Sequence, residues 1–336
     1  MPRLRTVSPN DMGWTRKASG RGFAYLNETG ERLPPEAVAR CKALVIPPAW
    51  KQVWICRDDN GHLQATGVDA AGRKQYLYHP RWRLKRDMEK HQRVLQVARR
   101  LPAARQKVCA DLDLAGMPRE RALAAAFRLL DLGFFRVGNE TYAEENGSYG
   151  LTTLLKEHVV VHKDSLEFDF VAKSGKRQQI ELVDEQARRA VATMRRRRAP
   201  GAELLAYKSA GAWVDVTSED VNAYVRLVIG DEMSAKDFRT WHATVLAAVA
   251  LAVSAETATS GAARKRAISR AMSEVADYLG NTPAVVRASY VDPRLIDLYD
   301  DGVTIAEALD ELGADTDSGS PATHGAVERA VLDLLA

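Results

Sequence analysis

The apolar positions of the chain change their spacing near residue 90, and this change predicts two regions. Before it, short β-favouring runs at 23–26, 53–56 and 63–68 alternate with Gly, Pro and Asp-Asn-Gly breakers, the rhythm of an antiparallel sheet. Beyond it, apolar residues recur at helical spacing. The pattern predicts an α+β fold with a β-rich N-terminal domain at 1–90, a mainly helical domain at 91–312, and an acidic tail with a short helix at 313–336.

Within the first region, residues 1–20 are polar and basic, and we expect an arm that is ordered only in part. The segment 72–80, in which basic residues are followed by aromatic ones, is expected to end this sheet as a strand, whose successive side chains alternate between two faces. That alternation places Gln75 on one face and Tyr76 and Tyr78 on the other. Residues 81–86 are strongly basic and are expected to form a connector to the second region.

The second region carries one long stretch in which Pro, Gly and Thr divide the helical pattern. An apolar stripe ends at Leu279, and Gly280 stands where a left-handed C-terminal residue is needed. Thr282 and Pro283 then suit the N-cap and first position of a new helix. Tyr290 follows about two turns later and just before Asp292-Pro293, so its hydroxyl is expected to be accessible.

Three basic residues are placed by similar patterns elsewhere in this region. Arg136 follows a helix that Pro118 opens and Gly133 closes. Lys173 lies at the tip of a hairpin predicted within 159–182. Arg239 lies in the first turns of a helix that Ser234 and Asp237 open as a capping box, where a nearly buried guanidinium needs an anion.

The charge of the chain is unevenly distributed, although its total is only +4. Residues 1–100 carry 20 Lys and Arg against 9 Asp and Glu, whereas residues 301–336 carry 1 against 8. A basic N-terminal module is typical of a protein that binds a polyanion, although a solvated basic surface would look the same.

Several classes of protein are disfavoured by what the sequence contains. The longest apolar run, 245–253, is too short to cross a bilayer, and the N-terminus does not resemble a signal peptide. Three widely spaced cysteines favour neither disulfides nor a zinc site. The chain contains neither a P-loop motif nor an acidic cluster with metal-ligand spacing. We therefore expect a cytoplasmic protein.

The ordered set of Arg136, Lys173, Arg239 and Tyr290, with Asn281 nine residues before the tyrosine, closely resembles the small type IB DNA topoisomerases of poxviruses and bacteria. The resemblance runs from about residue 20 to 300. It implies two domains that close as a clamp round duplex DNA, with Tyr290 as the nucleophile that forms a 3′-phosphotyrosine. Arg136 and Arg239 would bind the phosphate, and Lys173 would be the general acid. Residues expected to contact DNA are Gln75, Tyr76, Tyr78, Tyr142, Thr153 and Lys236.

The resemblance also implies that neither ATP nor a metal cofactor is needed, and we expect a monomer that works at the nucleoid. Asn281 departs from the family pattern, because the poxvirus-type enzymes carry histidine there, and a proton-transfer role for this position is in doubt. Tyrosine recombinases share the chemistry and are the rival class, but they usually carry histidine where this chain has Lys236. A DNA-binding protein without catalytic activity is a third reading, and it would make the intact set of four residues a coincidence.

Overall fold

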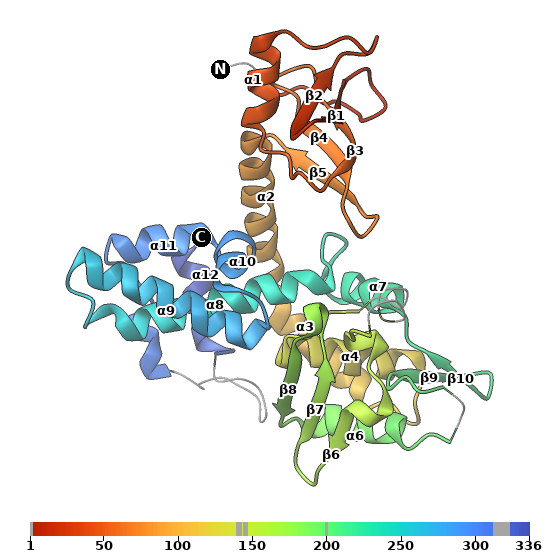
Figure 1. The fold of residues 1–336 in the computed structure, drawn as a ribbon. Helices are drawn as coiled ribbons and strands as arrows, with labels where there is room; N and C mark the ends of the chain where they lie inside the picture. Colours follow the sequence, from red (N-terminus) through yellow and green to blue (C-terminus); the bar gives the residue numbers. More distant parts are fainter. Residues whose placement is uncertain (1–2, 139–142, 144–146, 199–200, 312–322) are drawn as a thin grey trace. The chain divides into compact units, whose positions relative to one another are not determined.

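The computed structural model describes residues 3–138, 143, 147–198, 201–311 and 323–336. The chain forms two compact units, Met1–Lys90 and His91–Ala336 (Figure 1). Helix α2 (Pro80–Ala98) contributes residues to both. One unit is built on a β-sheet and the other is mostly helical, so the predicted α+β class is confirmed.

The first unit consists of a five-stranded antiparallel sheet of order β2-β1-β3-β4-β5 and the helix α1 (Pro35–Ala43). Its strands are β1 (Trp14–Ser19), β2 (Gly22–Leu26), β3 (Lys51–Ile55), β4 (Leu63–Val68) and β5 (Lys74–Tyr78). Buried side chains such as Val53, Ile55 and Cys41 form its core between sheet and helix. All three cysteines of the chain are free thiols.

The prediction of a partly ordered N-terminal arm is wrong, because β1 pairs with both β2 and β3 inside the sheet. The basic residue Arg16 obscured this strand in the sequence. Its guanidinium is buried and donates to the backbone carbonyls of Ile46, Pro47 and Trp50 at 2.8 to 2.9 Å. An arginine in the sequence suggests an exposed segment. A buried arginine whose guanidinium is hydrogen-bonded in this way is nevertheless compatible with a strand inside a sheet.

The second unit packs helices against two small antiparallel sheets. Its helices are α3 (Leu101–Leu112), α4 (Arg119–Gly133), α6 (Glu185–Arg195), α7 (Ser218–Ile229), α8 (Ala235–Ala255), α9 (Gly261–Leu279), α10 (Pro283–Ser289), α11 (Pro293–Asp300) and α12 (Ala326–Leu334). One sheet has the order β6-β7-β8, with β6 (Val159–Val161), β7 (Leu166–Val171) and β8 (Arg177–Leu182), and the other pairs β9 (Ala206–Ser209) with β10 (Ala212–Asp215). The expected basic connector at 81–86 is instead the start of α2.

Helix α8 is the central element of this unit, and Figure 1 shows it lying beside α9 and α12. Most of its residues are buried, among them Phe238 and Trp241, which are 0 and 1% exposed. Its length and hydropathy would allow it to cross a membrane, and it is the one candidate span among the described residues. Because 67% of that stretch is buried within the unit, the apolar character is that of a core helix.

The acidic C-terminal segment does not stand apart from this unit, since α12 packs into its core. Glu328 of α12 accepts hydrogen bonds from Arg105, which also donates to both oxygens of Asp131, at 2.8 and 3.0 Å. His242 of α8 bonds Asp131 at 3.2 Å, and His324 stacks on His242 with ring centroids 5.5 Å apart. This buried cluster joins α3, α4, α8 and the C-terminal segment.

The cluster has a defined dependence on pH. Burial lowers the pKa of His324 from 6.5 to about 4, so its protonation favours the unfolded chain as the pH falls between these values. Burial would raise the pKa of Asp131 and of Glu328, but the charge and hydrogen bonds of Arg105, together with the neighbouring His242 and His324, outweigh it and lower both. The stability that these carboxylates contribute is therefore also lost as the pH falls.

We expect the melting temperature of the second unit, followed by calorimetry, to fall between pH 7 and pH 4 for these reasons. His324→Gln should flatten this fall, because the amide does not take up a proton. An equal fall in the variant would show that His324 is not a source of the acid sensitivity.

Candidate active site

Tyr290 is presented by a short helix whose ends are set by the residues that the sequence singled out. Gly280 adopts the left-handed conformation after α9, with a φ of 60°. The Thr282 hydroxyl then accepts from the amide of Val285 at the start of α10. The Tyr290 amide donates to Val286 at 3.0 Å, so the tyrosine directly follows the last turn.

The tyrosine segment is also fastened to α8. The buried hydroxyl of Thr244 accepts from the amide of Asp292 at 3.2 Å, and its single proton is shared between the carbonyls of Thr240, at 3.0 Å, and Tyr290, at 3.4 Å. One side chain thus holds the backbone on both sides of residue 291. The same helix carries Lys236 and Arg239, so the nucleophile and two cations share one support.

Arg239 is 4% exposed, as the sequence led us to expect, but it is not unpaired. Its guanidinium donates to the carbonyls of Phe134 and of Leu279, the latter at 2.6 Å. The guanidinium carbon lies 5.6 Å from the centre of the Tyr290 ring. Burial and the neighbouring charge of Arg136 lower the pKa of Arg239 to about 10, which leaves it protonated at neutral pH.

Arg136 is paired with the side chain of Asn281. The Asn281 side-chain oxygen accepts from Arg136 at 2.5 Å, and the Gly280 carbonyl is 3.4 Å from the same nitrogen. Burial lowers the pKa of Arg136. The Asn281 amide nitrogen is buried and has no acceptor among the described residues. Asn281 therefore orients Arg136 and retains one free donor.

Lys173 and Lys236 approach the same site from two different elements. Lys173 lies at the tip of the β7–β8 hairpin, where Ser174 has a φ of 67° and turns the chain, as the sequence predicted. Lys236 lies in the first turn of α8. Both side chains are exposed, so they can reach a ligand without breaking a buried contact.

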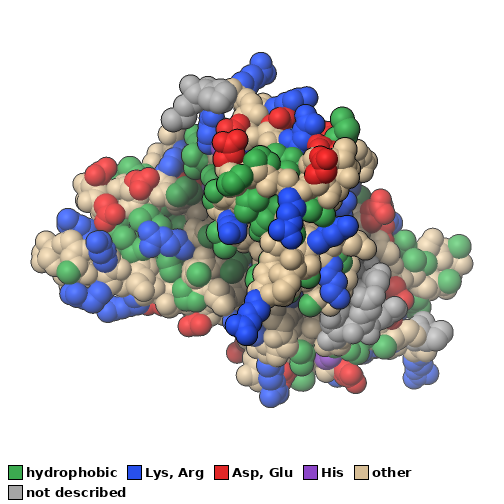
Figure 2. Space-filling model, turned by 45° about the horizontal axis from the view of Figure 1, so that its top comes forward, with side chains coloured by type: hydrophobic (Ala, Val, Ile, Leu, Met, Phe, Trp, Pro, Cys, Tyr) green, Lys and Arg blue, Asp and Glu red, His purple; other side chains and the backbone are tan. Residues whose placement is uncertain are grey.

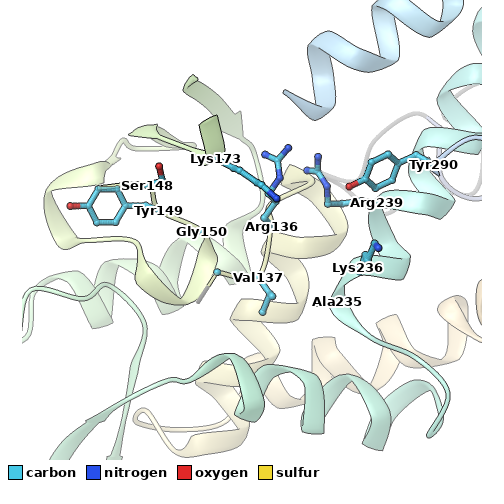
Figure 3. Close-up of a pocket in the computed structure, with 11 residues that line it drawn as sticks. Arg136, Val137, Ser148, Tyr149, Gly150, Lys173, Ala235, Lys236, Arg239 and Tyr290 are labelled. Atoms are coloured by element: carbon cyan, nitrogen blue, oxygen red, sulfur yellow. The ribbon is translucent and has the colours of Figure 1, made fainter. Parts of the chain in front are cut away.

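Tyr290 and the four basic side chains line one pocket of about 410 Å³, drawn in Figure 3, whereas Asn281 is not among its lining residues. The figure shows the Tyr290 hydroxyl pointing toward the guanidinium groups of Arg239 and Arg136. Its cationic and phenolic lining comes from Arg136, Lys173, Lys236, Arg239 and Tyr290. Four positive side chains around one phenol make a site for an anion that reacts with the phenol oxygen.

The cations also change the acidity of the phenol. Burial alone would raise the pKa of Tyr290, but the charge of Arg239, with contributions from Arg136 and Lys236, lowers it below the ordinary value. A more acidic phenol is more readily converted to the phenolate, which is the nucleophilic form.

The pocket contains residues that the sequence did not identify, namely Val137, Ser148, Tyr149 and Ala235. Two glycines flank Ser148 and Tyr149, and this could have marked the loop. Gly138 and Gly150 also line the pocket, and they pack so closely that a Cβ on Gly150 would lie 2.5 Å from the Gly138 Cα. The glycines thus let two backbone segments meet at the pocket.

Of the DNA contacts expected in the described part of the second unit, Lys236 lines this pocket and Thr153 does not. Thr153 is buried, and its hydroxyl accepts from the Gly150 amide and donates to the Gly150 carbonyl. It shapes the loop, and a direct contact with DNA would require breaking these bonds. Tyr142 lies outside the described residues.

The expected contacts in the first unit lie on β5, an edge strand of the sheet. Tyr76 is 47% exposed and stacks on Tyr78, with ring centroids 6.1 Å apart, so the two share a face as the alternation predicts. The Lys74 ammonium lies 5.8 Å from the Tyr76 ring. Gln75 is bonded to Asp69 at 2.9 Å on the other face.

The buried group of Asp131, His242 and His324 has side-chain atoms close enough to hold a metal ion, which the sequence spacing did not suggest. Both Asp131 oxygens, however, accept hydrogen bonds from Arg105. A guanidinium already occupies the position that a cation would take, so we assign the group a structural role.

Two family profiles match the chain. The profile described as "Eukaryotic DNA topoisomerase I, catalytic core" matches residues 79–310, and that of "Bacterial DNA topoisomerase IB, N-terminal domain" matches residues 22–69. Together they define a DNA topoisomerase. The chain belongs to the type IB topoisomerase family, and it is a small enzyme of the bacterial kind.

A relative supports the same assignment across both units. The chain is 29% identical over 295 residues to a protein of Acanthamoeba polyphaga mimivirus named "DNA topoisomerase 1B". The matched part covers 85% of this chain and 87% of the mimivirus protein.

Asn281 gives a prediction of its own. We expect Asn281→Ala to slow single-turnover cleavage of a suicide duplex by roughly 10- to 100-fold, because Arg136 loses the acceptor that orients it. Asn281→Asp should be slower still, since a carboxylate beside Arg136 offsets its charge and repels phosphate. Lys176→Ala is the matched control, because the Lys176 ammonium bonds the Asn281 backbone carbonyl, at 2.9 Å, and its removal leaves the Asn281 side chain in place. Wild-type rates in Asn281→Ala would remove this residue from the site.

Proposed function

We propose that this topoisomerase cuts and reseals one strand of duplex DNA through Tyr290. The phenolate oxygen attacks a phosphodiester phosphorus, and a bond from phosphorus to the Tyr290 oxygen forms. The bond from phosphorus to the 5′ oxygen breaks, so the products are a 3′-phosphotyrosine and a free 5′-hydroxyl. The cut strand rotates under torsional stress, and the reverse attack of the 5′-hydroxyl restores the DNA.

The lining of the pocket is the observation that carries this proposal. Negative charge builds on the nonbridging phosphate oxygens in the transition state, and guanidinium groups stabilise it well because their planar donors match phosphate. Arg136 and Arg239 lie beside the Tyr290 hydroxyl and are held by Asn281 and by backbone carbonyls. Both are therefore preorganised, and this reduces the rearrangement needed during reaction.

Lys173 is assigned the proton transfer. The leaving 5′ oxygen needs a proton, and an ammonium can donate one if it reaches that oxygen. The exposed position of Lys173 at the hairpin tip, on the rim of the Tyr290 pocket, suits this role. We assign Lys236 to electrostatic support of the phenolate, since its charge contributes to the lowered pKa of Tyr290.

The reaction is proposed to need neither ATP nor a metal ion. The phosphotyrosine bond has an energy similar to that of the bond it replaces, so resealing needs no external energy source. The four cations of the pocket supply the charge stabilisation that a metal would otherwise give. One chain supplies Tyr290 and all four basic residues of the pocket, and we propose that the enzyme acts as a monomer.

Duplex binding is assigned to both units through phosphate contacts. Figure 2 shows Lys and Arg side chains spread over the visible face and interspersed with acidic and apolar ones. A positive surface of this kind binds phosphate without reading sequence. In the first unit, the exposed Tyr76 and Lys74 of β5 are proposed to add contacts of the same kind.

The decisive experiment is relaxation of supercoiled plasmid in EDTA without ATP. We expect both negative and positive supercoils to be removed, and a covalent adduct between DNA and protein to be trapped by denaturant. Mass spectrometry of tryptic peptides should place the nucleotide on the peptide containing Tyr290. Strict dependence on Mg²⁺ or ATP, or a nucleotide on another residue, would contradict the mechanism.

A further inference from the structure

Two residues of α2 contact the segments that carry the active-site side chains. His91 and Arg93 both belong to the second unit, and they lie where α2 enters it. Neither is part of the pocket around Tyr290. Their partners, Asp292 and Asp237, are acidic and almost fully buried.

The contact of Arg93 is the stronger of the two. Its guanidinium donates to one oxygen of Asp237 at 3.0 Å. The other oxygen of Asp237 accepts from the amide and the hydroxyl of Ser234, each at 2.9 Å, and so caps α8. Asp237 is therefore fully engaged, and Arg93 is the charged partner of a carboxylate that is 3% exposed.

Asp237 stands between two residues of the pocket in the sequence. Lys236 precedes it and Arg239 follows two residues later, all within the first turns of α8. A shift of the capped turn would move both cations relative to Tyr290. The cost of such a shift is large in catalysis, because a displacement of about 1 Å can reduce a rate by about 100-fold.

The contact of His91 reaches the other half of the site. The His91 ring lies 3.9 Å from Asp292, which follows Tyr290 by two residues. The Asp292 amide donates to Thr244, whose hydroxyl also holds the Tyr290 carbonyl. One helix thus reaches both the turn with the cations and the segment with the nucleophile.

We propose that Arg93 is a positioning residue for strand cleavage, holding the first turn of α8 so that Lys236 and Arg239 face Tyr290. The inference rests on the proposed function and extends it to a residue outside the pocket. Arg93 touches neither phosphate nor leaving group in this role. It acts on the reaction rate through Asp237 and leaves the affinity for duplex DNA unaltered.

The experiment compares single-turnover cleavage and duplex affinity for Arg93→Ala, Arg93→Lys and the control Arg99→Ala. Arg99 is an exposed arginine directly after the end of α2, and its side chain makes no hydrogen bond or ion pair among the described residues. We expect Arg93→Ala to cleave about 10- to 100-fold more slowly with saturating enzyme, with a Kd within about 2-fold of wild type. Arg93→Lys should recover most of the rate, because it restores a cation beside Asp237.

A double variant separates positioning from general loss of structure. Arg93→Ala combined with Asp237→Asn should be no slower than Arg93→Ala alone, since the amide keeps an acceptor for Ser234 and removes the unpaired charge. Calorimetry must show each variant folded at the assay temperature.

Three results would overturn the proposal. The first is a wild-type rate in Arg93→Ala, and the second is a weakened Kd with an unchanged rate at saturation, which would make Arg93 a DNA contact. The third is a loss of rate in Arg93→Ala that is fully explained by the fraction of that variant that is unfolded. If instead wild-type protein forms no adduct at Tyr290, the proposed function fails, whatever the Arg93 variants do.

Discussion

Tyr290→Phe is expected to abolish strand cleavage and plasmid relaxation while leaving duplex binding intact. The substitution removes only the hydroxyl that would become bonded to phosphorus. Loss of a nucleophile costs on the order of 10⁶-fold in other enzymes, which here lies below detection. The four cations of the pocket remain, so phosphate can still bind.

The measurement is covalent trapping on a suicide duplex, with a gel-shift titration in parallel. Tyr278→Phe is the matched control, because it removes the same hydroxyl group from a tyrosine of α9 that is 64% exposed. It should cleave at the wild-type rate. Residual cleavage in Tyr290→Phe would mean that another residue attacks the phosphate.

Lys173→Ala should show the second large effect, a loss on the order of 10²- to 10⁴-fold in cleavage, as for a positioned general acid. The physical reason is that the 5′ oxygen must leave without its proton. A duplex with sulfur at the bridging 5′ position provides the test, because a thiolate leaves readily unprotonated. We expect this substrate to restore most of the rate in the variant.

Lys176→Ala is the control for charge at the hairpin, since Lys176 is also exposed near the same tip. It should respond to the sulfur substrate as the wild-type protein does. If Lys173→Ala cleaves the sulfur substrate no better, relative to the ordinary one, than wild type does, Lys173 is not the acid.

The tyrosine segment could be read from the sequence because its signals are local. Gly280, Thr282 and Pro283 each restrict the backbone by their own chemistry, and α9 ends and α10 begins where they require. The capping box of α8 is local in the same sense, and the structure pairs Ser234 with Asp237. Such signals survive folding because few long-range contacts compete with them.

The hydrogen-bond partners of the buried charged residues could not be predicted, because these partners lie far away in the sequence. Arg239 is held by carbonyls of Phe134 and Leu279, and a carbonyl carries no sequence signature. The strand β1 could not be predicted for the same reason, because its Arg16 is satisfied by a backbone carbonyl 30 residues away. The packing of the C-terminal helix could not be predicted either, because Arg105, the partner of Glu328, lies 223 residues away in the sequence.

The attachment of the tyrosine segment to α8 has a mechanical consequence. Arg239 donates a hydrogen bond to the carbonyl of Leu279, before α10. Thr244 forms hydrogen bonds with the backbone of Tyr290 and Asp292, after α10. The backbone that carries Tyr290 is therefore held on both sides of the tyrosine. A 3′ strand end joined to Tyr290 would stay fixed relative to α8. Torque in the DNA would then turn the free 5′ end and leave the nucleophile in place to receive it again.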